Sequence, residues 1–159
     1  MKNLIFNTQI CTTIEQSKRL LELGLDTDTS DMCWLAKKLW GDDVEIPEGD
    51  RSYILSTDKD DSFCRRYDVD CIPAWSLHRL IVMLPAVINT RILSMPMNYP
   101  DTRIVDFEHN SIAYLNMFGS GKMFNKNEGK YALYNNIIDC IEWLIQDGFF
   151  NKEYLLKEE

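Results

Sequence analysis

The segment from Gly119 to Lys122 is the first place where this sequence could do chemistry. Its residues, Gly-Ser-Gly-Lys, match the end of a P-loop, in which backbone N–H groups surround phosphate oxygens and the lysine contacts them. The complete motif also needs a glycine at the position of Asn116 and a serine or threonine at the position of Met123. We therefore expect a flexible strand-to-helix loop. The alternative is a nest of backbone N–H groups that binds an anion beside Lys122.

Metal-ligating residue types are present, but their spacing does not fit a metal site. Cys64, Cys71 and His78 recur at seven-residue intervals, whereas the paired ligands of a zinc knuckle usually lie about two to four residues apart. Two acidic segments, 26–31 and 58–63, imitate the start of a calcium loop but lack the glycine and the final glutamate that such a loop needs. The sequence therefore predicts no bound metal and no cofactor.

Residues suited to acid–base or nucleophilic catalysis do not form a recognisable group either. His78 and His109 are the only histidines, and no Gly-x-Ser-x-Gly nucleophile elbow accompanies them. The chain has 25 acidic residues, so carboxylate pairs of the glycosidase type could arise by chance at many places. We expect the protein to be non-enzymatic.

Length, charge and hydropathy narrow the class of protein. The 159 residues suit one globular domain, 1–159. A formal charge of −8 disfavours nucleic acid and anionic membrane surfaces as partners, because both are bound through Lys and Arg. The longest apolar run, 80–88, is too short to span a bilayer, and the N-terminus lacks the apolar run of a signal peptide. Five cysteines, without a Cys-x-x-Cys pair, favour reduced thiols. We expect a cytoplasmic protein.

Helical patterns occur in four segments. A capping box starting at Thr13 begins the first of them, and Gly24 follows its end. The last one has the strongest period in the chain, with apolar residues at i, i+3, i+4 and i+7 from Tyr134 and with Gly148 after its end. The expected helices cover residues 13–23, 31–40, 75–84 and 131–147.

Runs of β-branched and aromatic residues predict the strands. Short turns separate the last three runs, which implies an antiparallel meander. We expect a loop at 119–129 and a frayed tail at about 152–159. The expected strands cover residues 52–55, 87–94, 102–107 and 111–118. The element order is then ααβαβββα. It predicts an α+β fold in which an antiparallel sheet of three to four strands has helices packed on one face.

Most of the negative charge lies in an acidic excursion at about residues 42–70. This segment holds ten acidic and four basic side chains, a net charge of −6. Aromatic residues in and beside it could form a recognition patch for a basic protein or pack in the core, and for Phe63 and Tyr67 the two interpretations are evenly balanced. The candidate binding residues are Asp58, Asp60, Asp61, Phe63 and Tyr67 in the excursion, and Lys122 outside it.

Three segments are informative together: QSKRLLELGL at 16–25, IPAWSL at 72–77 followed by Leu84-Pro85, and the ending at 141–148. They resemble a group of small uncharacterised proteins encoded in Bacteroides-type bacterial genomes, prophages and mobile elements. The resemblance covers about half of the chain. It implies no catalytic residue, and it implies only the setting of a phage or mobile-element accessory protein. The chain departs from the group's pattern at residues 33–41 and in the acidic excursion, so a function specific to this chain would be located there.

Two functional hypotheses follow. The first is a non-enzymatic binding protein, a phage or mobile-element accessory protein that engages a basic host protein through the acidic, aromatic-flanked surface. The alternative is a small-ligand protein that binds or sequesters a nucleotide-type molecule with the Gly119–Lys122 loop. The first predicts salt-sensitive association with a protein, and the second predicts thermal stabilisation by the ligand.

Overall fold

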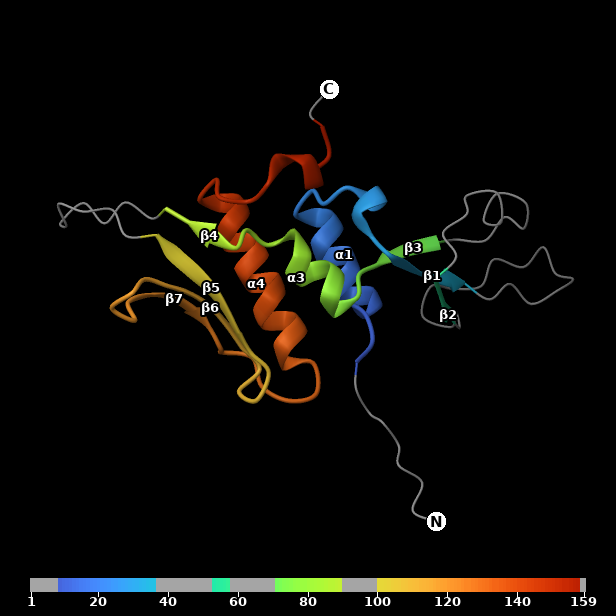
Figure 1. The fold of residues 1–159 in the computed structure, drawn as a ribbon. Helices are drawn as coiled ribbons and strands as arrows, with labels where there is room; N and C mark the ends of the chain where they lie inside the picture. Colours follow the sequence, from blue (N-terminus) through green and yellow to red (C-terminus); the bar gives the residue numbers. More distant parts are fainter. Residues whose placement is uncertain (1–8, 37–52, 58–70, 90–99, 158–159) are drawn as a thin grey trace, which may run out of the picture.

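The computed structural model describes residues 9–36, 53–57, 71–89 and 100–157, which form the α+β fold expected from the sequence (Figure 1). The helices are α1 (Ile14–Glu22), α3 (Leu77–Met83) and α4 (Ala132–Gln146), with 3₁₀ turns at Thr27–Thr29 and Lys152–Tyr154. The strands are β1 (Met32–Ala36), β2 (Tyr53–Ser56), β3 (Cys71–Ala74), β4 (Val87–Ile88), β5 (Asp101–Asp106), β6 (Ser111–Leu115) and β7 (Gly121–Phe124). The strands form two antiparallel sheets, one of three strands and one of four.

Polar residues fix where the first two helices begin. The Thr13 hydroxyl accepts a hydrogen bond from the Gln16 N–H at 3.2 Å, and the Gln16 side chain accepts one from the Thr13 N–H at 2.9 Å. This is the predicted capping box. Ser76 caps α3 by accepting from the Arg79 N–H at 3.1 Å. Helix α3 therefore begins at Leu77, two residues after its predicted start, and strand β3 precedes it.

The prediction of a helix at residues 31–40 is wrong, because residues 32–36 form strand β1 at the centre of the order β2-β1-β3. In this register Cys33 lies opposite Ser56 on one side and Pro73 on the other. The apolar residues of the segment have helical spacing, but two distant strands supply hydrogen-bond partners along both of its edges. Tertiary pairing therefore overrides a local helical pattern. Residues 37–40 lie outside the described part of the chain.

The four-stranded sheet has the order β4-β5-β6-β7, and each neighbouring pair is antiparallel. Strands β5 and β6 confirm two of the expected runs. Strand β4 begins where its run was expected, at Val87, and residues 90–94 of that run lie outside the described residues. Strand β7 corrects the prediction of a loop throughout 119–129. Gly121 and Lys122, which begin the strand, are residue types depleted in strands, and pairing with β6 supplies the stabilisation instead.

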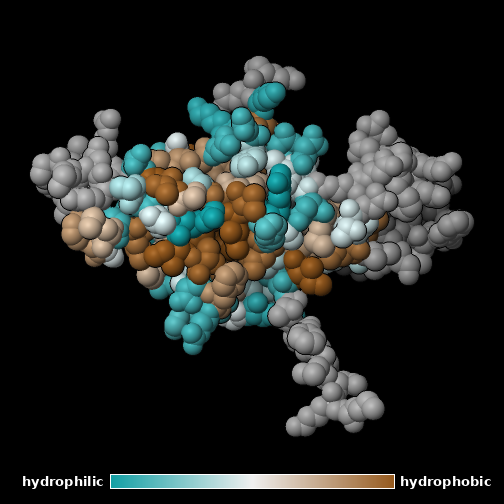
Figure 2. All heavy atoms as spheres, in the orientation of Figure 1, coloured by the Kyte–Doolittle hydropathy of each residue, from teal (hydrophilic) through white to brown (hydrophobic). Residues whose placement is uncertain are grey.

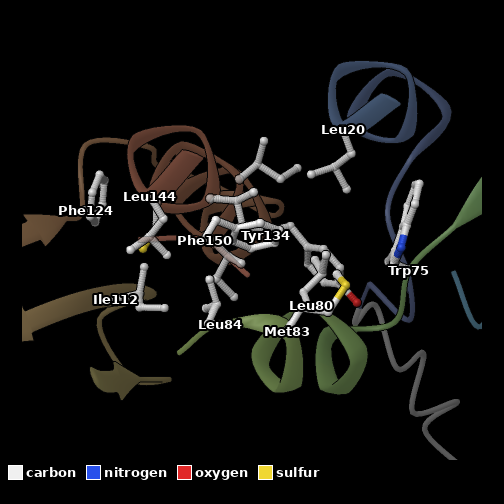
Figure 3. Packing of buried hydrophobic residues seen from close by; sticks show 14 of the residues in the cluster. Leu20, Trp75, Leu80, Met83, Leu84, Ile112, Phe124, Tyr134, Leu144 and Phe150 are labelled. Carbon is white, nitrogen blue, oxygen red and sulfur yellow. The ribbon is translucent and has the colours of Figure 1, made fainter. Parts of the chain in front are cut away.

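Helix α4 packs against β6 and β7, and α1 and α3 pack beside α4. The core lies between these elements. Figure 3 shows Leu144 of α4 near Ile112 of β6 and Phe124 of β7. Trp75, at the end of β3, has no exposed surface, and its indole N–H donates to the Thr29 hydroxyl at 2.9 Å. Trp75 is therefore a core residue and not part of an exposed recognition patch.

The C-terminal segment also differs from its expectation as a frayed end, as far as residue 157. After the 3₁₀ turn, Leu155 forms an isolated antiparallel bridge with Leu25. The Leu156 N–H donates to the Gly24 carbonyl at 2.8 Å, and the Asp26 N–H donates to the Tyr154 carbonyl at 2.9 Å. The segment therefore pairs with the chain that follows α1.

Candidate functional site

The segment from Gly119 to Lys122 belongs to the hairpin between β6 and β7, so it is not a strand-to-helix loop. The Gly119 N–H donates to the Asn116 carbonyl at 2.9 Å, and the Asn116 N–H donates to the Ser120 carbonyl at 2.9 Å. Hydrogen bonds of this pattern close a three-residue hairpin loop with a left-handed third residue. Gly119 supplies that residue, with φ at 74°.

The backbone N–H groups of this turn are already bonded to Asn116. The side-chain oxygen of Asn116 accepts from the Phe118 N–H at 2.9 Å and from the Ser120 N–H at 3.1 Å. The N–H of Gly119, between them, donates to the Asn116 carbonyl. Three successive donors therefore point toward one asparagine, the residue that interrupts the P-loop motif. This geometry disfavours an anion nest at the turn.

Lys122 lies on β7 with an exposed side chain, and its ammonium is 5.9 Å from the centre of the Phe124 ring. It stands at the rim of a pocket of about 270 Å³ between β7 and the first turns of α4. We refer to this cavity as the β7–α4 pocket. Its lining residues are Lys122, Met123, Phe124, Lys126, Asn136 and Asp139.

Asn136 fixes the wall of the β7–α4 pocket and is completely buried. Its side-chain oxygen accepts from the N–H and from the side-chain amide of Asn127, at 3.1 and 2.8 Å. Its own amide donates to the Asn110 carbonyl at 2.8 Å. The Asn127 amide also donates to Asp139 at 2.8 Å. The chain between β7 and α4 is therefore held against the helix.

The Arg19 guanidinium of α1 lies 2.7 Å from the Asp139 carboxylate and 2.5 Å from the Glu142 carboxylate, so two anions share this one cation. Burial opposes the charged form of Arg19, but hydrogen bonds to Glu142 and Asp139 outweigh it and raise the Arg19 pKa. With Asp139 paired in this way, Lys122 and Lys126 give the rim of the β7–α4 pocket a positive charge.

The side of the four-stranded sheet that faces away from α4 is apolar. Val105 and Ile112 face the core, so their neighbours along the strands point the other way. In the described strands Asp106, at one end, is the only charged residue on this side. We call this side the outer face, and it consists of Val87, Thr102, Ile104, Asp106, Ser111, Ala113, Leu115, Gly121 and Met123.

Large side chains on the outer face remain exposed to solvent. Ile104 and Met123 flank the small Ala113 across three strands, with exposed fractions of 48% and 49%, and Val87 has 50%. Phe118, in the adjoining β6–β7 turn, has an exposed fraction of 60%. Figure 2 shows hydrophobic surface beside polar residues in the region of β4, β5 and α3. A contiguous apolar surface of this kind usually marks a contact site.

The histidines have separate, exposed positions. His78 lies on α3, and His109 lies in the turn after β5, as predicted. Asp106 accepts from the His109 N–H at 3.1 Å, and its second oxygen is 2.8 Å from Nδ1 of the His109 ring. These bonds to the carboxylate lower the Asp106 pKa. The pair closes a surface turn, and this is a structural role.

The cysteines of the described segments form no disulfide. Burial raises the pKa of Cys11 to about 11 and that of Cys140 to about 12, so neither thiol is a nucleophile at neutral pH. Cys140 lies in the hydrophobic core. Within the described ranges no group of three or more His, Cys, Asp or Glu residues is arranged to hold a metal ion.

Of the predicted site residues, the structure describes Lys122 alone. The other candidates, Asp58, Asp60, Asp61, Phe63 and Tyr67, lie outside the described residues. Sequence reasoning missed Asn127, Asn136 and the whole outer face. An alternation of exposed apolar residues across β5 and β7 could have indicated that face, but β7 was not recognised as a strand.

Comparison with protein-family models, curated proteins and solved structures found no match. No helix in the described part of the chain has the length and hydrophobicity to cross a membrane.

Proposed function

We propose that this chain is a non-enzymatic protein-binding module that contacts its partner through the outer face of the four-stranded sheet. The observation that carries the proposal is the exposure of Val87, Ile104 and Met123, each about half exposed, on a face with a charge only at its end. Burying such a surface gains about 25 cal/mol per Å² of apolar area, so a complementary partner has a clear driving force.

The small-ligand alternative has less support, because the turn donors that would bind phosphate are bonded to Asn116. The acidic excursion at 42–70 remains a proposed second contact surface for a basic protein, and the resemblance to phage and mobile-element proteins suggests a bacterial host protein as the partner. The outer face is apolar and the excursion is acidic. Variants that add charge to the outer face therefore test the first surface, and variants that reverse charge in the excursion test the second.

Cross-linking capture from lysate of a Bacteroides-type bacterium tests the proposal. The chain carrying Ile104→Glu and Met123→Glu places two charges on the outer face at half-exposed positions, where the fold tolerates them. We expect it to lose the protein captured by the unchanged chain. Circular dichroism and thermal unfolding establish that the variant is folded.

The matched control carries Ile10→Glu and Leu156→Glu, which add the same charges at exposed apolar residues away from the outer face. It should retain capture. A third variant, Asp58→Lys with Asp60→Lys and Asp61→Lys, tests the acidic excursion. If the outer-face variant captures the same partner as the unchanged chain, or if the unchanged chain captures no specific protein, the proposal is wrong.

A further inference from the structure

Strand β7 is the edge of the four-stranded sheet opposite β4, and among the described strands it pairs only with β6. The edge of a sheet presents backbone N–H and C=O groups that can pair with another extended chain. Several protein-binding domains use such an edge to receive a peptide as an additional strand.

The register shows which backbone groups of β7 face away from β6. The hydrogen bond from the Asn116 N–H to the Ser120 carbonyl makes these two residues a hydrogen-bonded pair. Such pairs alternate along an antiparallel ladder, so Tyr114 with Lys122 is the next one. Met123 lies in the pair between, opposite Ala113. Its N–H and C=O therefore point outward, toward the place of an added strand.

The β7–α4 pocket opens beside this edge. Residues 122–124 of β7 form one wall, and Asn136 and Asp139 of α4 form the other. A strand paired with β7 would lie next to the pocket, and one of its side chains could enter the volume of about 270 Å³. An edge strand next to a helix, with a pocket between them, has the geometry of a peptide groove.

Charge selects the kind of chain that fits. Lys122 and Lys126 stand at the rim, and Arg19 pairs with both Asp139 and Glu142. These three cations and two anions leave a local charge of +1. A second copy of this chain would place its own Lys122 beside the first, and like charges on adjacent strands repel. An extended segment with acidic side chains meets the opposite charge instead.

We propose that β7 and the β7–α4 pocket bind an extended acidic segment of a partner protein by strand addition. The backbone of the segment pairs with Met123, and acidic side chains contact Lys122 and Lys126. The inference rests on the proposed function only in treating the chain as a protein-binding module, because the outer face and the β7–α4 pocket are adjacent surfaces that share Met123 and no other residue.

Fluorescence anisotropy with a short, end-blocked peptide in which glutamate alternates with valine tests the inference. We expect saturable binding that weakens as salt rises, since the charges lie at the surface. Amide resonances of Gly121 and Met123 should shift on binding. A peptide with lysine in place of glutamate, and one with N-methylated alternate peptide bonds, should bind about tenfold more weakly or not at all.

Protein variants separate backbone pairing from charge. Met123→Pro removes only the outward N–H and leaves the bonds to β6 in place, and proline is tolerated on edge strands. We expect it to weaken peptide binding about tenfold, while the matched variant Met123→Val binds like the unchanged chain. Lys122→Glu with Lys126→Glu should weaken binding by a similar factor and remove its dependence on salt.

Equal binding by Met123→Pro and Met123→Val would overturn strand addition. Equal binding of the glutamate and lysine peptides would overturn the assignment of an acidic partner, and no binding of the glutamate peptide would overturn both. The capture experiment is repeated with Ile104→Glu alone, which changes the outer face and leaves Met123 intact. This variant keeps the two proposals distinct. If Ile104→Glu loses capture and the unchanged chain does not bind the glutamate peptide, the outer-face proposal is supported and the β7-edge proposal is rejected.

Discussion

Gly121 occupies a position at the start of β7 where the neighbouring backbone leaves no room for a side chain. A Cβ atom at this residue would lie 1.9 Å from the carbonyl oxygen of Tyr114, on the paired strand β6. A contact of this length with backbone cannot be relieved by rotating a side chain, so β6 and β7 would have to separate. The glycine that suggested a phosphate site in the sequence is required for the close approach of two strands.

We predict that Gly121→Ala destabilises the protein by about 2–3 kcal/mol, the range typical of a backbone clash in a paired strand. Urea unfolding measures this difference. The control is Gly119→Ala, where a Cβ meets no atom within 4 Å but φ is 74°. The left-handed conformation costs an alanine about 1–2 kcal/mol. Equal and small losses in both variants would show that β7 is not held at this distance from β6.

Single residues also show what the sequence could reveal of the site. Asn116 was noted as the residue that breaks the P-loop motif, and this was enough to expect that no P-loop is present. In the structure, Asn116 accepts hydrogen bonds from three backbone N–H groups of the β6–β7 hairpin. That role depends on β6 and β7 being paired, and a pairing between strands is not visible in the local sequence.

At the scale of elements, local signals were reliable where an element makes its own hydrogen bonds. Helix α4 has an apolar period along its length, and it begins and ends within a residue of the predicted bounds. Strand β1 obtains its bonds from β2 and β3, which are distant in sequence, so its helical spacing was misleading. The outer face was missed for the same reason, because it combines residues of four strands that only the register brings together.

Asn136 of α4 forms hydrogen bonds to Asn127 and to Asn110, so replacing it tests how much these bonds contribute to stability. We predict that Asn136→Ala destabilises the protein by about 2 kcal/mol, because the Asn127 N–H and the Asn110 carbonyl lose a buried partner. Thermal or urea unfolding measures the loss. Asn125→Ala, at an exposed asparagine nearby, should change stability by less than about 0.5 kcal/mol. A loss at Asn136 no larger than at Asn125 would contradict this role.

At the scale of the whole molecule, the C-terminal segment fastens the end of the chain to the residues that follow α1. Besides its backbone bonds, Tyr154 has the Arg79 guanidinium 5.9 Å from its ring centre and packs edge-on against Phe150. Leu155 packs against the core. The polar and charged sequence of 152–159 favours a frayed end when read alone, and its contacts with Gly24 and Leu25 could not be inferred from it.

We predict that a chain ending at Asn151 loses about 2 kcal/mol of stability and unfolds at a lower temperature, since two partly buried side chains and two backbone hydrogen bonds are removed. A chain ending at Lys157 retains these contacts and should unfold like the full chain. Differential scanning calorimetry compares the three. Identical midpoints for the full chain and the chain ending at Asn151 would restore the interpretation of a frayed tail.

The three-stranded sheet is built from strands joined by long connections. Strand β1 ends at Ala36 and β2 begins at Tyr53, and β2 ends at Ser56 whereas β3 begins at Cys71. The entropy cost of closing a connection grows only with the logarithm of its length, by about 0.6 kcal/mol per doubling. Insertions in these connections therefore cost the fold little. Sequence changes between these strands can accumulate while the paired strands keep their register.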